Sequence, residues 1–145
     1  MPYATSANMV ARFDEAQLLK VASVMVGDVE TLDTTKIAGA IAGADAIINL
    51  HVRGRYAVPL SPVDPEILGI SCDIARYKLY GDATNAPEAA KDAYEAALAM
   101  LVAIRDGKAT LTATVASATD PAATANDVEM VSEDPVFTTD KLKGF

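Results

Sequence analysis

The chain contains a single histidine, His51, and a single cysteine, Cys72, which are its best candidates for nucleophilic chemistry. A cysteine nucleophile needs a base beside it and a third group that orients the base, so both residues would have to meet in one cleft. Cys72 instead falls on an apolar stripe of a predicted helix, and buried structural cysteines are common. The sequence therefore predicts no catalysis, and an enzyme fragment would require His51 and Cys72 in contact.

Metal and cofactor sites also leave recognisable patterns, and the sequence carries none of them. One histidine, one cysteine and scattered carboxylates do not have the spacing of metal ligands. A glycine-rich phosphate loop, a G-x-S-x-G motif and a dinucleotide fingerprint are also missing. We therefore expect no metal and no cofactor, and a protein that acts by binding.

Two pairs of charged residues remain as candidate contact residues. Arg53 and Arg55 flank Gly54 at a predicted helix end, where positive charge suits the helix dipole. They could also face DNA, or an acidic partner. Asp73 and Arg76 belong to a structural polar seam on another helix, where they could pair with each other. Alternatively, Arg76 could reach a neighbouring element.

The elements that position these residues are read from apolar periodicity, caps and breakers. Gly54 is expected to end one helix in the left-handed conformation, and three prolines at 59, 62 and 65 exclude helix from most of the following connector. Residues 24–28 are expected to form a loop. The predicted helices cover residues 6–13 after Thr5 as N-cap, 15–24 after Asp14, 34–53 after Asp33 or Thr34, 66–80, and 88–105 after Pro87.

The composition changes at residue 109. Leu111, Ala113 and Val115 alternate with threonines, a period of two that suits an extended strand. The remainder is polar, acidic and broken by prolines, so it cannot fold alone. We expect residues 1–108 to form a helical bundle and residues 109–145 an extended C-terminal arm. Its partner-docking residues are predicted to be Leu111, Val115, Val136, Phe137, Leu142 and Phe145.

Consecutive helices with modest links predict an all-α fold, a small antiparallel helical bundle whose C-terminal arm can add a β-strand on assembly. The chain has 145 residues and a net charge of −8, which disfavours binding of nucleic acid by bulk charge. No apolar run reaches the length of a membrane-spanning helix, so no membrane partner is expected.

The connector and the helix after it also carry a family resemblance. Gly54, Arg55 and Tyr56 form a G-R-Y motif, Pro59 and Leu60 follow, and residues 72–80 read C-D-I-A-R-Y-K-L-Y. With the opening Y-A-T and the A-R-F around Arg12, these motifs resemble the Mu phage neck-protein family, a group of small tailed-phage morphogenesis proteins. The resemblance covers roughly residues 3–108.

The resemblance implies a structural virion protein, a head–tail connector (adaptor) in the neck, assembled in the host cytoplasm. It implies a ring of copies, commonly twelve in related neck systems. Its expected partners are the portal protein, neighbouring copies and a downstream neck or tail-completion protein, with at most non-specific contact with DNA in the lumen. The alternative is a small helical DNA-packaging or DNA-binding accessory protein, which a basic face on the helix 34–53 would support.

Overall fold

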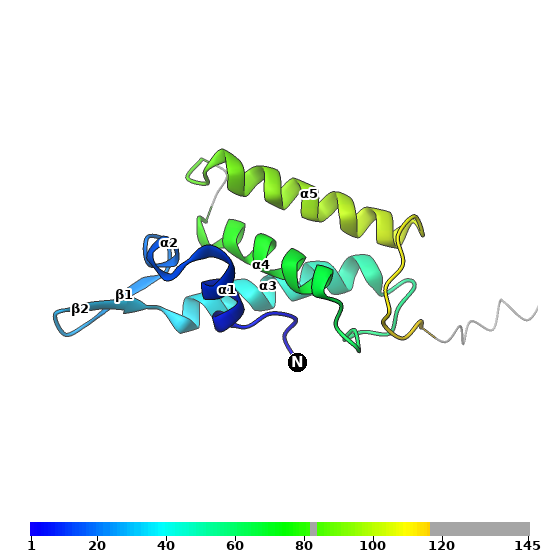
Figure 1. Ribbon diagram of the computed structural model, residues 1–145, viewed down its shortest axis with the longest axis horizontal. Helices are drawn as coiled ribbons and strands as arrows, with labels where there is room; N and C mark the ends of the chain where they lie inside the picture. The colour runs from blue at the N-terminus through cyan, green and yellow to red at the C-terminus, as the bar shows by residue number, and fades with distance from the viewer. Residues whose placement is uncertain (82–83, 117–145) are drawn as a thin grey trace, which may run out of the picture.

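The computed structural model describes residues 1–81 and 84–116 of the chain. Three long helices lie side by side in this part of the chain, with two short helices and a β-hairpin near one end (Figure 1). The elements in chain order are α1 (Ser6–Phe13), α2 (Glu15–Leu19), β1 (Ser23–Val26), β2 (Val29–Leu32), α3 (Thr34–Val52), α4 (Pro65–Leu79) and α5 (Glu88–Arg105).

The starts of α1 and α3 are capped by side chains at positions that the sequence predicts. The Thr5 hydroxyl accepts a hydrogen bond from the Asn8 amide at 3.3 Å, and the Asn8 side chain accepts one from the Thr5 amide at 2.9 Å. The Asp33 carboxylate accepts from the Lys36 amide at 2.9 Å and opens α3. Each cap satisfies amides that have no partner within the first helical turn.

The helix 34–53 ends within one residue of its expected end, but the predicted conformation of Gly54 is wrong. Gly54 is not in the left-handed region, because the amides of Arg55 and Tyr56 both donate to the Val52 carbonyl at 2.9 Å and carry the chain on in a further right-handed turn. Gly107 has a φ of +80° and ends α5 as expected. Its amide donates to the Ile104 carbonyl at 3.2 Å.

The prediction of an all-α antiparallel bundle is wrong. Residues 23–32 form a two-stranded antiparallel sheet, in which Val26 pairs with Val29 across Gly27 and Asp28. Gly27 has a φ of +64°, the conformation that the first central position of a tight hairpin turn requires. The expected helix 15–24 ends at Leu19, because residues 23–26 form the first strand of this sheet. With two short helices and a sheet beside the three long ones, the described residues do not form a clear helical bundle (Figure 1).

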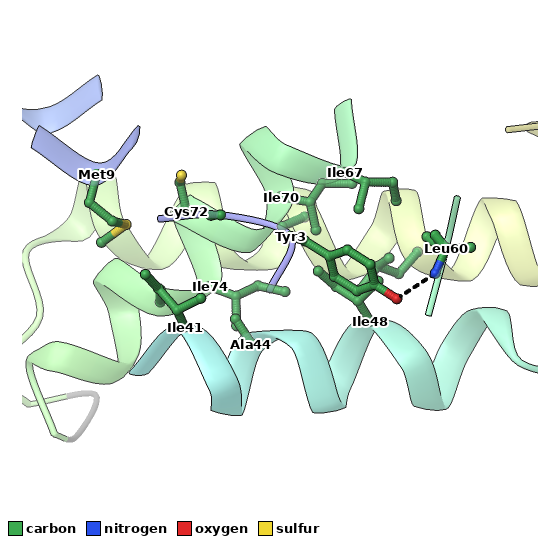
Figure 2. Close-up of a cluster of buried hydrophobic side chains, with 14 of the residues drawn as sticks. Tyr3, Met9, Ile41, Ala44, Ile48, Leu60, Ile67, Ile70, Cys72 and Ile74 are labelled. Atoms are coloured by element: carbon green, nitrogen blue, oxygen red, sulfur yellow. Dashed lines mark hydrogen bonds between the residues drawn. The ribbon is translucent and has the colours of Figure 1, made fainter. Parts of the chain in front are cut away.

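The core lies mainly between α3 and α4. The predicted stripe of α3 is buried along its whole length and packs on the isoleucines of α4 (Figure 2). α5 packs against α4 and α3 through Ala97, Leu101 and Ile104, while Tyr94 stacks on Tyr77 with 4.2 Å between ring centroids. The buried side chains of α3 and α4 are Ile37, Ile41, Ala44, Ile48, Val52, Ile67, Ile70, Ser71, Cys72, Ile74, Ala75 and Leu79.

Candidate functional site

The two residues with nucleophilic potential lie on different helices and are bound into them. Cys72 is completely buried in α4, and burial raises the pKa of its thiol to about 11. The Nδ1 atom of His51 lies 2.9 Å from the Ile47 carbonyl oxygen of its own helix α3. A thiol with this pKa stays protonated at neutral pH, which is the opposite of what a cysteine nucleophile needs.

Asp73 and Arg76, the two charged residues of the polar seam on α4, contact different residues in the N-terminal part of the chain. Asp73 accepts two hydrogen bonds from Arg12 of α1, at 3.1 Å from Nε and 2.9 Å from Nη2. These bonds raise the pKa of Arg12. Arg76 lies over the ring of Phe13, 4.7 Å from its centroid, and donates to Gln17 at 3.5 Å. Of the two readings that the sequence left open, the structure shows Arg76 reaching a neighbouring element.

This geometry predicts which pair of charges is energetically coupled. Arg12→Ala should lower the free energy of unfolding by about 1 kcal/mol, because the bidentate pair is half-exposed on the arginine side. A double-mutant cycle of Arg12 and Asp73, measured by urea unfolding, should give a coupling of about 0.5–1 kcal/mol. The matched control is the cycle of Asp73 and Arg76, for which we expect no coupling. A larger coupling in the control cycle would contradict the structure.

The two arginines around Gly54 have different environments. Arg53 is exposed, whereas Arg55 reaches across to the C-terminal end of α5. The Nη1 atom of Arg55 donates to the Ile104 carbonyl at 3.3 Å, and its guanidinium lies against Gly107. Arg55 therefore binds the end of α5, where its charge also suits the dipole. The side chain of Arg53 makes no hydrogen bond or ion pair with the described residues.

Residues 109–116 pack on the connector between α3 and α4. Thr114 accepts a hydrogen bond from the Ala57 amide at 3.0 Å and donates its own amide to the Ser61 carbonyl at 3.1 Å, while the Ala116 amide donates to Arg55. Thr112 donates to the Asp64 carboxylate through its amide and its hydroxyl, at 2.9 and 2.6 Å. This extended segment thus pairs with its own chain (Figure 1).

The predicted docking residues of the arm fall into three groups. Leu111 is half-buried and packs against the core, and its amide donates to the Tyr56 hydroxyl at 2.9 Å. Val115 forms an isolated bridge with Tyr56 but leaves 66% of its surface exposed. The others lie outside the described residues: Val136, Phe137, Leu142 and Phe145.

A buried network that the sequence did not reveal fixes the N-terminal segment on α3. The Tyr3 amide donates to Asp45 at 3.2 Å, and its buried hydroxyl accepts from the Leu60 amide at 3.0 Å and donates to Asn49 (Figure 2). Asp45 also accepts from the Ser71 hydroxyl at 3.0 Å, and burial raises the pKa of its carboxyl group. The network connects the N-terminus, α3, the connector and α4.

Four of the exposed large apolar side chains of the described residues lie on the β-hairpin. Met25, Val26 and Val29 are 62–64% exposed, and Val24 is 42% exposed. The hairpin extends beyond the start of α3, away from the three long helices (Figure 1). A two-stranded sheet leaves both outer edges without strand partners and is only marginally stable in water. Apolar side chains and free edges together are typical of a surface that another molecule covers.

The sequence did contain a signal for this hairpin. Valines 24, 26 and 29 flank the Gly27–Asp28 dipeptide, and two residues of this type between β-branched runs indicate a tight hairpin. The valines are equally compatible with the end of the preceding helical pattern, which is why residues 24–28 were expected to form a loop.

Metal-binding clusters and membrane-spanning helices are absent from the described residues. Within residues 1–81 and 84–116, no group of three or more histidine, cysteine or acidic side chains could hold a metal ion. In the same part of the chain, no helix combines the length and the apolar character that crossing a membrane requires.

Comparison with known proteins identifies the family. A family model described as "Bacteriophage Mu, Gp36" matches residues 3–130. The chain is also similar to the "Mu-like prophage FluMu protein gp36" of Haemophilus influenzae, with 28% identity over 109 residues, which make up 75% of this chain and 74% of that protein. The match confirms the resemblance to Mu phage proteins and extends past residue 108. The chain therefore belongs to the bacteriophage Mu Gp36 family.

Proposed function

We propose that the protein is a head–tail connector subunit of a tailed phage. In this proposal, copies of the chain form a ring in the neck of the virion, bind the portal protein and join the head to the tail through a downstream neck or tail-completion protein. Membership of a Mu phage family supports a structural or morphogenetic role. The connector position, the ring and the portal contact are our inference.

The exposed hairpin is the observation that carries this proposal. Its four exposed apolar side chains lie on one short element that extends from the body (Figure 1). A surface of this kind gains free energy when a partner removes it from water, at about 25 cal/mol per Å². The buried, protonated Cys72 supports binding rather than catalysis as the activity.

The DNA-binding alternative has less support. The net charge is −8, and the guanidinium of Arg55 is engaged with the end of α5. Lys36, at the start of α3, donates to the Val21 carbonyl at 2.6 Å and therefore faces the hairpin base. α3 thus does not present the basic face that this alternative requires, and we propose at most non-specific contact with DNA.

Complementation of a Mu-like phage that lacks its Gp36-family gene tests the proposal. Without the protein, heads and tails should accumulate unjoined, and the wild-type chain should restore joined particles. The double variant Met25→Asp, Val26→Asp should fold normally, because both side chains are exposed in the free chain, yet reduce infectious titre at least tenfold, the effect of losing about 1.4 kcal/mol of binding.

Leu50→Asp is the matched control, since Leu50 is 57% exposed on α3 and the same charge is introduced. It should complement like the wild type. Joined particles in the absence of the protein would overturn the connector role. Full complementation by the hairpin variant would show that the hairpin is not the assembly surface.

A further inference from the structure

A basic pocket lies at the end of the molecule where α4 finishes, beside α2 and the base of the hairpin. It has a volume of about 670 Å³. Its charge comes from Lys20 and Arg76, and its apolar wall comes from Val21, Leu79, Tyr80 and Pro87. Of the described residues that line it, none is acidic.

The two cations of this pocket form no ion pair within the described residues, unlike three other cations of the chain. Arg12, Lys91 and Arg105 each form an ion pair with a carboxylate. Arg76 instead meets Phe13 and Gln17, and Lys20 forms no ion pair within residues 1–81 and 84–116. In a chain with a net charge of −8, two cations in one hollow that have no carboxylate partner among residues 1–81 and 84–116 attract a negatively charged ligand.

The C-terminal part of this chain contains a segment of matching chemistry. Residues 127–134 read D-V-E-M-V-S-E-D, with four carboxylates, three apolar side chains and no base. An alternation of acidic and apolar residues fits a pocket that combines two cations with an apolar wall. Charge complementarity of this kind contributes orientation and specificity to a contact.

The length of the chain allows this segment to reach the pocket. Residues 112–116 are held at the start of α4 and on the connector, through Asp64, Ser61 and Arg55. The pocket lies at the other end of α4, whose 15 residues span about 22 Å at 1.5 Å per residue. The ten residues between Ala116 and Asp127 extend to about 33 Å at 3.3 Å per residue.

We propose that residues 127–134 bind in the basic pocket of their own chain. A covalent linker of this length gives a local concentration in the millimolar range, so a modest affinity is sufficient. The contact places residues 135–145, with Phe137, Leu142 and Phe145, beside the base of the hairpin. The two apolar docking elements of the protein then lie at one end of the molecule and can bind one partner together. This inference goes beyond the proposed function and does not depend on it.

Paramagnetic relaxation in the free, full-length chain tests the proposal. Ser132→Cys provides a site for a nitroxide label and keeps every charge of the segment. Cys72 should remain unlabelled at neutral pH, because it is buried and its pKa is raised to about 11. We expect the label to broaden the amide signals of Lys20, Val21 and Leu79 and to leave those around Arg53, at the opposite end of α3, unchanged.

Charge variants make this test specific. Lys20→Glu combined with Arg76→Glu should abolish the broadening, and reversal of the four carboxylates of residues 127–134 to lysine in that background should restore it. Arg53→Glu is the matched control and should change nothing. The Arg76→Glu change removes the packing of Arg76 on Phe13 as well as its charge. A salt titration of the chain with Lys20 and Arg76 intact therefore provides an independent measurement. The broadening should weaken at an ionic strength of about 1 M, where the Debye length is about 3 Å.

Two outcomes would overturn the proposal. One is the absence of broadening at the pocket in the unmodified background at low salt. The other concerns a mixture of two chains, one isotope-labelled without nitroxide and one spin-labelled without isotope. If the signals of the pocket broaden in this mixture as much as in the doubly labelled chain, the segment occupies the pocket of a second copy. Both results are independent of the complementation experiment, so the failure of one proposal does not affect the other.

Discussion

Truncation after Lys108 is expected to lower the free energy of unfolding by about 3 kcal/mol, because it removes at least five hydrogen bonds that each contribute about 0.5–1.5 kcal/mol net. The truncation removes backbone bonds to Ala57, Ser61 and Arg55 and two bonds to the Asp64 carboxylate. It also removes Ala113, which is 4% exposed, from the core. Urea unfolding followed by far-UV circular dichroism measures the change.

Truncation after Ala116 is the matched control and should have a much smaller effect, because every contact of residues 109–116 is retained. Ala113→Asp in the full-length chain provides a second measurement, since it places a charge in the core without shortening the chain. Equal stability of the two truncated proteins would show that residues 109–116 do not belong to the folded unit. In the structure, residues 109–116 contact the connector and the core, although their composition assigned them to the arm.

Substitution of Tyr3 is the second change for which we expect a large effect. Tyr3→Phe should lower the free energy of unfolding by about 1–3 kcal/mol, because the Leu60 amide loses its partner in a buried position. Tyr3→Ala should cost about 3–5 kcal/mol, because it also removes a buried ring from the cluster around Ile48 (Figure 2). Thermal and urea unfolding measure both values.

Tyr77→Phe is the control for the hydroxyl group. The Tyr77 ring stacks on Tyr94, and its hydroxyl makes no hydrogen bond to a residue of the ranges 1–81 and 84–116. This variant should change stability by less than about 0.5 kcal/mol, as is usual away from buried polar groups. A Tyr3→Phe variant as stable as the wild type would mean that the Leu60 amide finds another acceptor.

The N-terminal segment and the connector therefore contribute to one folding unit, although both are irregular in backbone. Tyr3 holds Leu60 from one side, and Thr114 holds Ser61 from the other. The connector carries the G-R-Y and P-L motifs by which the sequence resembles its family. The structure gives these motifs a physical role, since Arg55, Tyr56 and Leu60 are contact points for α5, Leu111 and the N-terminus.

Local signals in the sequence were sufficient for α1 and for the three long helices, whereas α2 is shorter than predicted. Thr5 and Asp33 were predicted as caps because their short side chains carry an oxygen that accepts hydrogen bonds from amides of the first helical turn. The stripe of α3 from Ile37 to Val52 was predicted because burial of one helix face repeats every three to four residues. The sequence motifs also identified the Mu phage family, which the comparison confirms.

Partners that are distant in sequence were decided by the tertiary structure alone. Arg12 and Asp73 are 61 residues apart, and nothing local to either distinguishes that pair from a pair of Asp73 and Arg76. The alternation from Leu111 to Val115 predicted an extended segment. Periodicity indicates the conformation of a segment, but it does not indicate which other segment provides its hydrogen-bond partners. That other segment is the chain's own connector. The hairpin was missed because four-residue strands carry too few positions to separate a period of two from the end of a helix.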